Sequence, residues 1–220
     1  MINTLIFDFD GTILDTEAPW YYSYRDLYEK HEVDLPLKLF EQVIGSTFAN
    51  FNPFDYLVER TGMMLDEAEL RAYTVERHAF YMQAQQIRPG VIDYLEAAKA
   101  AGMKRAIASS SSREWVEGYA VKLGIRDYFQ EIVTSDDVEI VKPNPALYLT
   151  ALSRLGSVAD EAIAIEDSRN GMLAANAAGI RCVVVPNDVT SDMDFTECQL
   201  QLNSLADQSL EEIVRQLLIA

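Results

Sequence analysis

The chain has 220 residues, of which 49% are hydrophobic, and a formal net charge of -17 at pH 7. This acidic balance argues against binding to nucleic acid or to anionic membranes, because both affinities depend on lysine and arginine. The apolar runs are far shorter than the roughly 20 residues of a membrane span, and no basic and then apolar leader opens the chain. We therefore expect a soluble, cytoplasmic protein of one or two compact domains.

The first predicted element is a buried strand over residues 4–10, which ends in two aspartates, Asp8 and Asp10, before Gly11. Alternate residues of an extended chain face the same side, so this strand predicts that Asp8 and Asp10 point together. Two like charges in a partly dry site repel each other strongly. A cation between them, or a proton on one of them, is needed to relieve that repulsion. Gly11 is a turn former that lets the backbone approach a ligand closely.

Residues 17–86 show helical periodicity, interrupted at proline and glycine positions. Aromatic and aliphatic residues recur three and four positions apart and predict the core of a helical bundle: Trp20, Tyr24, Leu27 and Tyr28. His31 and His78 lie on helical stretches among charged residues, which predicts that both are solvated.

From residue 89 the pattern alternates between helix and strand. The predicted helices span 91–101, 112–124, 145–155, 169–178 and 209–219, and the predicted strands span 104–109, 130–134, 162–166, 181–185 and 198–203. Repeated strand-helix units predict a doubly wound α/β fold, in which helices cover both faces of a parallel, Rossmann-like sheet and ligands bind at the carboxyl ends of the strands. We expect residues 1–15 and 87–220 to form this core domain, and residues 16–86 to form a small, inserted α-helical domain.

Four consecutive serines, Ser109 to Ser112, follow one of the predicted strands. Ser111 and Glu114 fit the S-x-x-E capping box, which predicts that Ser111 begins the next helix. Such a helix start brings hydroxyls and free backbone N–H groups together and is a natural site for an anion. A helix cap without a ligand is the alternative.

A lysine and two acidic residues follow the next strands. Lys142 lies in a proline-stiffened loop before Asn144 and Pro145, which we expect to be the N-cap and the first residue of a helix. An isolated lysine is ordinarily a solvated surface charge. Glu166 and Asp167 stand at the end of the strand that comes after this helix.

The parallel sheet brings these acidic strand ends to one edge, so their carboxylates are expected to converge in one pocket. The four predicted metal-site residues are Asp8, Asp10, Glu166 and Asp167. Oxygen ligands without histidine or cysteine are typical of a hard cation, and Mg²⁺ fits best because it also accepts water and substrate phosphate. Such an ion lets an acidic protein bind a small anionic substrate. Motifs of zinc proteases, EF-hands, P-loops and dinucleotide-binding folds are missing from the sequence.

Paired aspartates suit the hydrolysis of phosphate monoesters, which is so slow unaided that a two-step route through a carboxylate nucleophile is favoured. We expect Asp8 to attack phosphorus and to bind the metal through its side chain. Asp10 would protonate the leaving alkoxide and later accept a proton from water, so it would give the metal only its backbone carbonyl. Ser109 and Lys142 would hold and neutralise the transferring phosphoryl oxygens.

These residues resemble the haloacid dehalogenase-like hydrolase superfamily, in the branch of the β-phosphoglucomutases and phosphoglycolate-type phosphatases. The match consists of D-F-D-G-T at 8–12, an apolar strand ending in Ser109, Lys142 followed by proline, and Glu166-Asp167 ahead of Ser168 and Gly171. The resemblance implies Mg²⁺-dependent phosphoryl transfer through an aspartyl-phosphate on Asp8, with Asp10 as acid and base. It also implies that Asp167 binds the metal, that Glu166 does so directly or through water, and that residues 16–86 form a helical cap.

The expected partner is a small, sugar-phosphate-like metabolite. The candidate substrate-binding residues are Thr16, Trp20, Ser110 and Ser111. Mutases of this branch carry a histidine where this chain has Trp20 and an arginine where it has Phe48, so we favour a phosphatase over β-phosphoglucomutase-type transfer. Trp20, Tyr21 and Phe48 either line the substrate pocket or pack within the cap. The sequence leaves the oligomeric state open, and a monomer fits it.

Three other functions explain fewer of these residues. A metal-free dehalogenase leaves Asp10 and the Glu166-Asp167 pair without a role. A phosphoacceptor signalling domain is much shorter and has no helical insertion after its first strand. A non-catalytic interaction protein has no need for all four of the strand-end motifs that this chain keeps.

Overall fold

The computed structural model describes residues 1–44 and 51–219. Within them a six-stranded sheet has the order β3-β2-β1-β4-β5-β6, and all its neighbouring strands are parallel. The strands are β1 (Thr4–Phe7), β2 (Lys104–Ala108), β3 (Glu131–Val133), β4 (Ala162–Glu166), β5 (Arg181–Val184) and β6 (Leu200–Gln201). The predicted α/β fold with a doubly wound, parallel sheet is confirmed.

β1 lies at the centre of the sheet, where the strand order reverses. Phe7 is aligned with Ile107 of β2 on one side and with Ile165 of β4 on the other. Such a reversal leaves a crevice beyond the carboxyl end of the central strand. The predicted strand over residues 4–10 is too long, because β1 ends at Phe7 and the chain then turns at Gly11, which has a φ of 79°. Asp8 and the following residues therefore leave the alternation of the strand.

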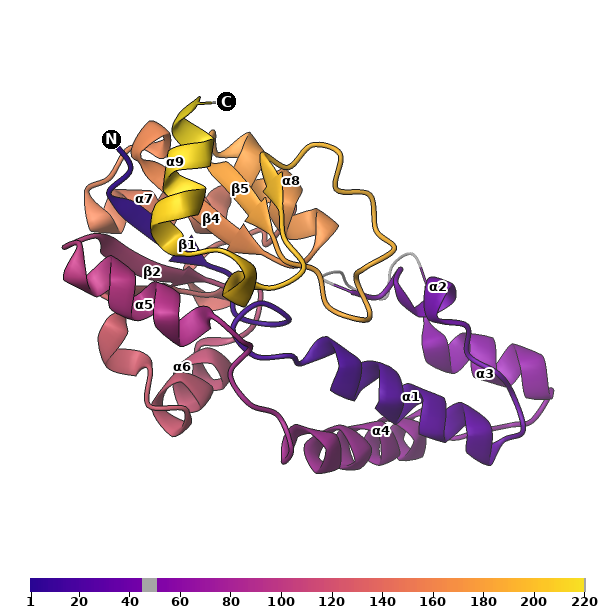
Figure 1. Ribbon diagram of the computed structural model, residues 1–220. Helices are drawn as coiled ribbons and strands as arrows, with labels where there is room; N and C mark the ends of the chain where they lie inside the picture. The colour runs from indigo at the N-terminus through magenta and orange to yellow at the C-terminus, as the bar shows by residue number, and fades with distance from the viewer. Residues whose placement is uncertain (45–50, 220) are drawn as a thin grey trace.

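Helices cover both faces of the sheet (Figure 1). They are α5 (Val91–Ala100), α6 (Arg113–Lys122), α7 (Ala146–Leu155), α8 (Arg169–Ala177) and α9 (Leu210–Ile219). Leu5 and Phe7 of β1 lie in the apolar cluster with α5, α6 and α9, whereas Ile6 lies in the cluster with α7 and α8. Because both faces are buried, the strands are almost continuously apolar rather than alternating.

The start of α6 differs from the predicted capping box. Its N-cap is Ser112, whose hydroxyl accepts a hydrogen bond from the backbone N–H of Trp115 at 3.4 Å. The box predicted from Ser111 and Glu114 is therefore wrong by one residue. The hydroxyl of Ser111 is used elsewhere, in a contact with Asp10 at 2.7 Å.

α7 also begins one residue later than predicted, with Pro145 at the N-cap position and Ala146 as its first residue. The side chain of Asn144 still accepts a hydrogen bond from the backbone N–H of Ala146, at 3.0 Å. Short 3₁₀ helices complete the connections: η1 (Arg126–Tyr128), η2 (Ser135–Asp137), η3 (Ala159–Glu161) and η4 (Leu205–Asp207).

A helical segment lies beside the carboxyl edge of the sheet (Figure 1). Its described helices are α1 (Glu17–Lys30), α2 (Leu37–Phe40), α3 (Pro53–Thr61) and α4 (Glu67–Met82). Aromatic side chains from three of these helices meet in one apolar cluster, in which Tyr24, Tyr28, Phe40 and Phe54 are buried. The aromatic periodicity of this segment is therefore mainly core packing, as predicted.

The two chain crossings between this segment and the sheet are tied together. Leu14 and Ile87 form an isolated antiparallel bridge, and the backbone N–H of Arg88 donates to Ile13 O at 2.9 Å. The Arg88 guanidinium donates to the carbonyls of Gly11, Val185 and Pro186. One side chain thus fixes the loop that carries Asp8 to the chain that leaves β5.

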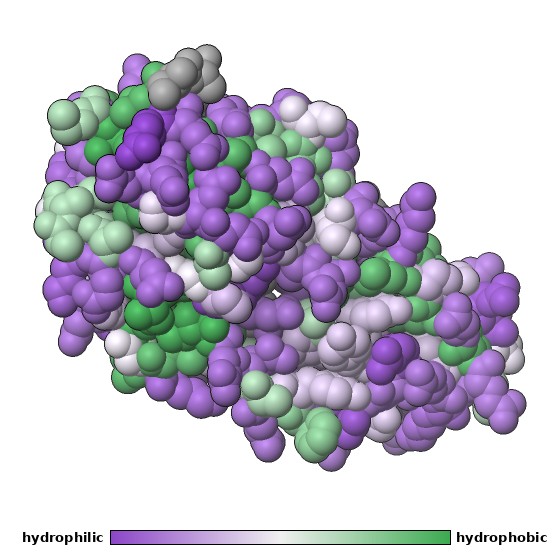
Figure 2. Space-filling view, viewed as in Figure 1, coloured by the Kyte–Doolittle hydropathy of each residue, from purple (hydrophilic) through white to green (hydrophobic). Residues whose placement is uncertain are grey.

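Hydrophilic residues cover most of the face shown in Figure 2, with smaller hydrophobic areas between them. Among the described residues, no helix combines the length and the apolar character that crossing a membrane requires.

Candidate active site

An acidic cluster with one lysine lies beyond the carboxyl ends of β1 and β4. Asp8, Glu166 and Asp167 are buried, and each offers one carboxylate oxygen such that the three oxygens lie within 4.8 Å of one another. Lys142 is also buried, and its Nζ lies 2.5 Å from Asp8 Oδ1 and 2.7 Å from Glu166 Oε1. One lysine balances only one of three negative charges. The cluster therefore fits a divalent cation, which would balance the other two.

Neutral side chains orient two of these carboxylates. The Tyr148 hydroxyl donates to Glu166 Oε1 at 2.5 Å. Asp167 accepts a hydrogen bond from the Asn187 amide at 2.8 Å and a longer one from the Thr12 hydroxyl at 3.5 Å. Such outer partners set the direction in which a carboxylate presents its oxygens to a metal.

Two glycines leave the space that the carboxylates occupy. A Cβ on Gly11 would lie 2.1 Å from Asp167 Oδ2, and a Cβ on Gly171 would lie 1.9 Å from Glu166 Oε2. Gly11 also has a positive φ, which favours glycine independently. The loop after β1 and the first turn of α8 therefore pack directly on the acidic cluster only because both positions lack a side chain.

Burial and mutual repulsion make this cluster unfavourable when no cation is bound. Burial raises the pKa of Asp8 to about 8, against the lowering effect of the Lys142 charge. Burial, with the charges of Asp8 and Glu166, raises the pKa of Asp167 well above its ordinary value. Burial lowers the pKa of Lys142, but the charges of Asp8 and Glu166 outweigh burial and raise that pKa overall. The lysine thus stays charged, while the raised pKa values of Asp8 and Asp167 favour their protonated forms unless another positive charge is present.

Asp10 lies in different surroundings, although it is only two residues from Asp8. Its Oδ2 accepts hydrogen bonds from Ser111 Oγ at 2.7 Å and from Ser109 Oγ at 3.2 Å. Its Oδ1 accepts one from the indole N–H of Trp115 at 2.8 Å. The structure therefore brings together three of the four predicted carboxylates and turns the side chain of Asp10 toward α6, because the chain has already left the strand.

The predicted substrate residues are not all alike. The hydroxyls of Thr16 and Ser110 are buried and have no hydrogen-bond partner in the part of the chain that the structure describes. Both hydroxyls thus keep unused hydrogen-bonding capacity. Trp20 is half-buried and stacks on His78, with ring centroids 3.8 Å apart and planes 12° apart. Phe48 lies outside the described residues.

His78 is not solvated, contrary to the prediction from its charged neighbours in sequence. It is 5% exposed, and burial lowers its pKa to about 4. Its ring lies between the helical segment and the sheet domain, stacked on Trp20 and 5.8 Å from the ring of Trp115. His78 lies on the buried face of α4, whereas its charged neighbours in sequence lie on other faces. Those neighbours therefore led to the wrong prediction for the environment of His78.

Sequence reasoning missed four residues that contact or adjoin the site. Three of them are Tyr148, Asn187 and Trp115, which hydrogen-bond to Glu166, Asp167 and Asp10. The fourth is Glu17, in the first turn of α1, where burial together with the nearby charges of Asp10 and Asp8 raises its pKa to about 8. Glu17 had a usable signal in the sequence, because it is an acidic residue at the first position of the helical segment.

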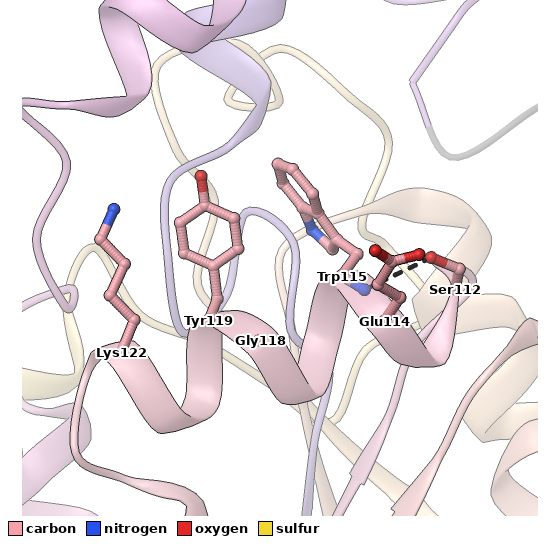
Figure 3. Close-up of a pocket in the computed structure, with 6 residues that line it drawn as sticks. All are labelled: Ser112, Glu114, Trp115, Gly118, Tyr119 and Lys122. Carbon is pink, nitrogen blue, oxygen red and sulfur yellow. Dashed lines mark hydrogen bonds between the residues drawn. The ribbon is translucent and has the colours of Figure 1, made fainter.

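A cavity of about 430 Å³ lies along α6, lined by Ser112, Glu114, Trp115, Gly118, Tyr119 and Lys122. Figure 3 shows Trp115, Tyr119 and Lys122 projecting to the same side of this helix. The Trp115 and Tyr119 rings are 4.6 Å apart at their centroids. The indole N–H of Trp115 reaches Asp10, so this cavity adjoins the Asp10 side of the site.

The sequence pattern of the haloacid dehalogenase-like hydrolases matches residues 5–185. The chain belongs to this family. The match includes the loop after β1, the serines after β2, Lys142 and the acidic pair at the end of β4, which are the residues that form the site. The protein is accordingly a hydrolase of the haloacid dehalogenase-like type.

Relatives of known name are similar over almost their whole length. The chain is 48% identical over 210 residues to "Putative phosphatase YhcW" of Bacillus subtilis (strain 168), with 96% of this chain and 95% of the relative covered. It is 27% identical over 213 residues to "Phosphorylated carbohydrates phosphatase" of Thermotoga maritima, with 97% of each chain covered.

Solved structures give the same fold. The crystal structure of CbbY from Rhodobacter sphaeroides in complex with phosphate superimposes with a TM-score of 0.72 at 29% identity, covering 94% of this chain and 96% of that one. The β-phosphoglucomutase of Clostridium difficile superimposes with a TM-score of 0.73 at 25% identity, covering 100% of this chain and 98% of that one.

Proposed function

We propose that the protein is a Mg²⁺-dependent phosphatase that hydrolyses small, sugar-phosphate-like metabolites through an aspartyl-phosphate intermediate. The observation that carries this proposal is the buried cluster of Asp8, Glu166 and Asp167 with Lys142 at the carboxyl edge of the sheet. The names of two relatives, a phosphatase and a phosphatase of phosphorylated carbohydrates, support it. The phosphate complex of CbbY supports a phosphate site in this fold.

The donor set of the cluster suits a hard cation, because it offers carboxylate oxygens and neither imidazole nor thiolate. We assign the side chains of Asp8, Glu166 and Asp167 as ligands, and the backbone carbonyl of Asp10 as a further ligand. A bound Mg²⁺ would supply positive charge to the phosphoryl oxygens. It would also keep the buried aspartates ionised at neutral pH.

The two aspartates then divide the chemistry. An ionised oxygen of Asp8 attacks phosphorus, the bond from phosphorus to the leaving oxygen breaks, and Asp10 gives that oxygen its proton. Water then attacks the phosphorus of the aspartyl-phosphate, Asp10 takes a proton from this water, and inorganic phosphate leaves with Asp8 restored. Ser109 and Lys142 hold the phosphoryl oxygens during both steps.

We assign the segment 16–86 as a cap over a core formed by residues 1–15 and 87–220. Closure of the cap would exclude water from the crevice before attack. The Leu14–Ile87 bridge and the hydrogen bonds of Arg88 hold the two chain crossings side by side. This arrangement supports a hinge at the crossings, about which the segment 16–86 would turn. Proposed substrate contacts are Thr16, Trp20, Ser110 and Ser111. We add Glu17, whose raised pKa would let its carboxyl group donate a hydrogen bond to the oxygen of a substrate hydroxyl. A cytoplasmic location is supported by two free thiols, Cys182 and Cys198.

β-Phosphoglucomutase-type transfer is the second candidate, supported by the similarity to the Clostridium difficile enzyme. The assay that separates the two supplies β-glucose 1-phosphate with its bisphosphate activator. Efficient formation of glucose 6-phosphate supports a mutase, and release of inorganic phosphate supports a phosphatase.

The test of the proposal is the release of inorganic phosphate from a panel of phosphorylated metabolites, with Mg²⁺ and with EDTA. Chelation is expected to abolish activity, and Asp8→Asn is expected to lower kcat by about 10⁴-fold or more, as loss of a nucleophile does. The matched control is Asp93→Asn on the exposed first turn of α5, which is expected to retain full activity. Full activity in Asp8→Asn would falsify the nucleophile assignment.

A further inference from the structure

The loop between β5 and β6 packs against the helical segment. Figure 1 shows this loop running from the carboxyl end of β5 toward α2. Val189 in this loop is only 2% exposed and belongs to the aromatic cluster of the helical segment, together with residues such as Tyr24 and Phe40. Met193 packs against the same cluster from a partly buried position. A residue of the sheet domain is thus part of the core of the helical segment.

The same turn also contacts Asp167, one of the acidic residues of the cluster. Asn187, which is 8% exposed, accepts hydrogen bonds on its Oδ1 from the backbone N–H groups of Val189 at 2.9 Å and Thr190 at 3.1 Å. Its Nδ2 donates to Asp167 Oδ2 at 2.8 Å. Its own backbone N–H donates to Thr190 Oγ1 at 3.0 Å. One amide therefore joins the turn that carries Val189 to the carboxylate of Asp167.

These contacts require an amide at position 187. The oxygen faces two N–H donors and the nitrogen faces a carboxylate, so each end of the side chain has a complementary partner. An aspartate there would place a second negative charge against Asp167 and would lose the donor. A serine would still cap the turn, because its hydroxyl accepts from the same backbone groups, but it is too short to reach Asp167.

From this geometry we infer that Asn187 is a positioning residue that makes Mg²⁺ binding at Asp167 depend on the docking of the helical segment on Val189. The inference rests on the proposed function, since it takes Asp167 as a metal ligand. When the segment is docked, Val189 is buried, the turn is fixed, and the amide holds Asp167 in one orientation. When the segment moves away, Val189 loses its apolar contacts and the turn that aims the amide is less constrained. The remaining hydrogen bond to Asp167, from Thr12, is the longer one at 3.5 Å.

The test measures Mg²⁺ binding to the full chain by isothermal titration calorimetry, without substrate. Asn187→Ser, which keeps the turn and removes the contact with Asp167, is expected to weaken Mg²⁺ binding by about 10- to 100-fold, as loss of an outer partner of a metal ligand does. Val189→Ala, which removes apolar contacts but keeps Asn187, is expected to weaken binding by a smaller factor. The matched control is Asn176→Ser, because Asn176 donates to Glu197 O at the far end of the same loop, and it is expected to bind Mg²⁺ like the wild type.

The double variant decides between coupling and two separate effects. If docking acts through the amide, adding Val189→Ala to Asn187→Ser changes Mg²⁺ affinity no further. Wild-type affinity in Asn187→Ser, or an equal effect of Val189→Ala in both backgrounds, overturns the inference. Thermal unfolding in EDTA confirms that each variant is folded, and Asn187→Ala serves as a second variant if Asn187→Ser is not. Failure of the wild type to bind Mg²⁺ refutes the proposed metal dependence itself, whereas normal binding by all variants refutes only the coupling.

Discussion

The two aspartates of the loop after β1 lie in contrasting environments. Asp8 is buried among charges, with Lys142 at 2.5 Å and two further acids within the same cluster. Asp10 is half-buried, and among residues 1–44 and 51–219 the hydrogen bonds to its carboxylate come from neutral groups: Ser109, Ser111 and the Trp115 indole. The Asp8 side is an acidic cluster that fits a cation. The Asp10 side adjoins the helical segment through the ring contact between Trp115 and His78. One short loop thus places two aspartates, two residues apart, in environments with different physical requirements.

Replacement of Asp10 tests its proposed role in proton transfer. It has the largest expected effect on turnover among the changes below. Asp10→Asn removes the group that exchanges a proton, and kcat is expected to fall by about 10²- to 10⁴-fold, which is no more than the loss in Asp8→Asn. The measurement compares an alkyl phosphate with p-nitrophenyl phosphate, whose leaving group needs no proton. The loss is expected to be smaller for the second substrate. An equal loss for both substrates contradicts the assignment of Asp10 as an acid.

Removal of the Trp115 indole N–H tests whether the neutral hydrogen-bond donors around Asp10 matter for turnover. Trp115→Phe keeps a ring beside His78 and Tyr119 but deletes the N–H that Asp10 Oδ1 accepts. An intramolecular hydrogen bond contributes about 0.5–1.5 kcal/mol, so kcat is expected to fall by about 2- to 10-fold while KM changes little. The control is Tyr119→Phe, which removes a hydroxyl from the same face of α6 and is expected to leave kcat unchanged. A Trp115→Phe enzyme as fast as the wild type shows that the bond has no role in turnover.

The pH dependence of thermal stability tests the charged surroundings of Asp8. Its expected effect is the smallest of those considered. The pKa of Asp8 is raised from 3.8 to about 8 and that of Glu17 from 4.5 to about 8, so the folded protein binds these protons more tightly than the unfolded chain does. Their contribution to stability is complete below the unfolded pKa and is lost as pH rises through the folded pKa. In EDTA, the Tm is therefore expected to fall between about pH 6 and about pH 9.

Mg²⁺ reverses this trend if the cluster binds it. Thermal unfolding with and without Mg²⁺ is expected to show the larger increase in Tm at the higher pH, where protons no longer neutralise the acids. Asp8→Asn serves as the control, because removal of one titrating acid flattens the dependence on pH. A Tm in EDTA that rises over this pH range contradicts the assigned pKa values.

The sequence was sufficient for the sheet and for the acidic cluster, because parallel strands deliver their carboxyl ends to one edge. The predictions from sequence were wrong where contacts between distant parts of the chain override a local sequence rule. The two-residue period applied only as far as Phe7, since the chain then turns at Gly11. The capping box at Ser111 did not form, because the Ser111 hydroxyl bonds to Asp10 instead. The environment of His78 depends on which face of α4 packs inward, and its sequence neighbours do not reveal that.

The residues that orient the site had no local signal at all. Tyr148 is 18 residues from Glu166, Asn187 is 20 residues from Asp167, and Trp115 is 105 residues from Asp10. Each occupies an ordinary position in a helix or loop, and its role follows only from the folded arrangement. Reactive groups could therefore be predicted from the strand ends, whereas their outer partners are brought to the site only by the folded chain.

The glycine at position 171 has a consequence for mutational surveys of this protein. Even alanine there adds one carbon atom, on top of the Glu166 carboxylate and in the first turn of a helix that would otherwise favour it. A substitution that improves the helix in isolation would thus inactivate the enzyme without removing any group that reacts. Screens that score this position by helix propensity alone will miss its contact with the Glu166 carboxylate.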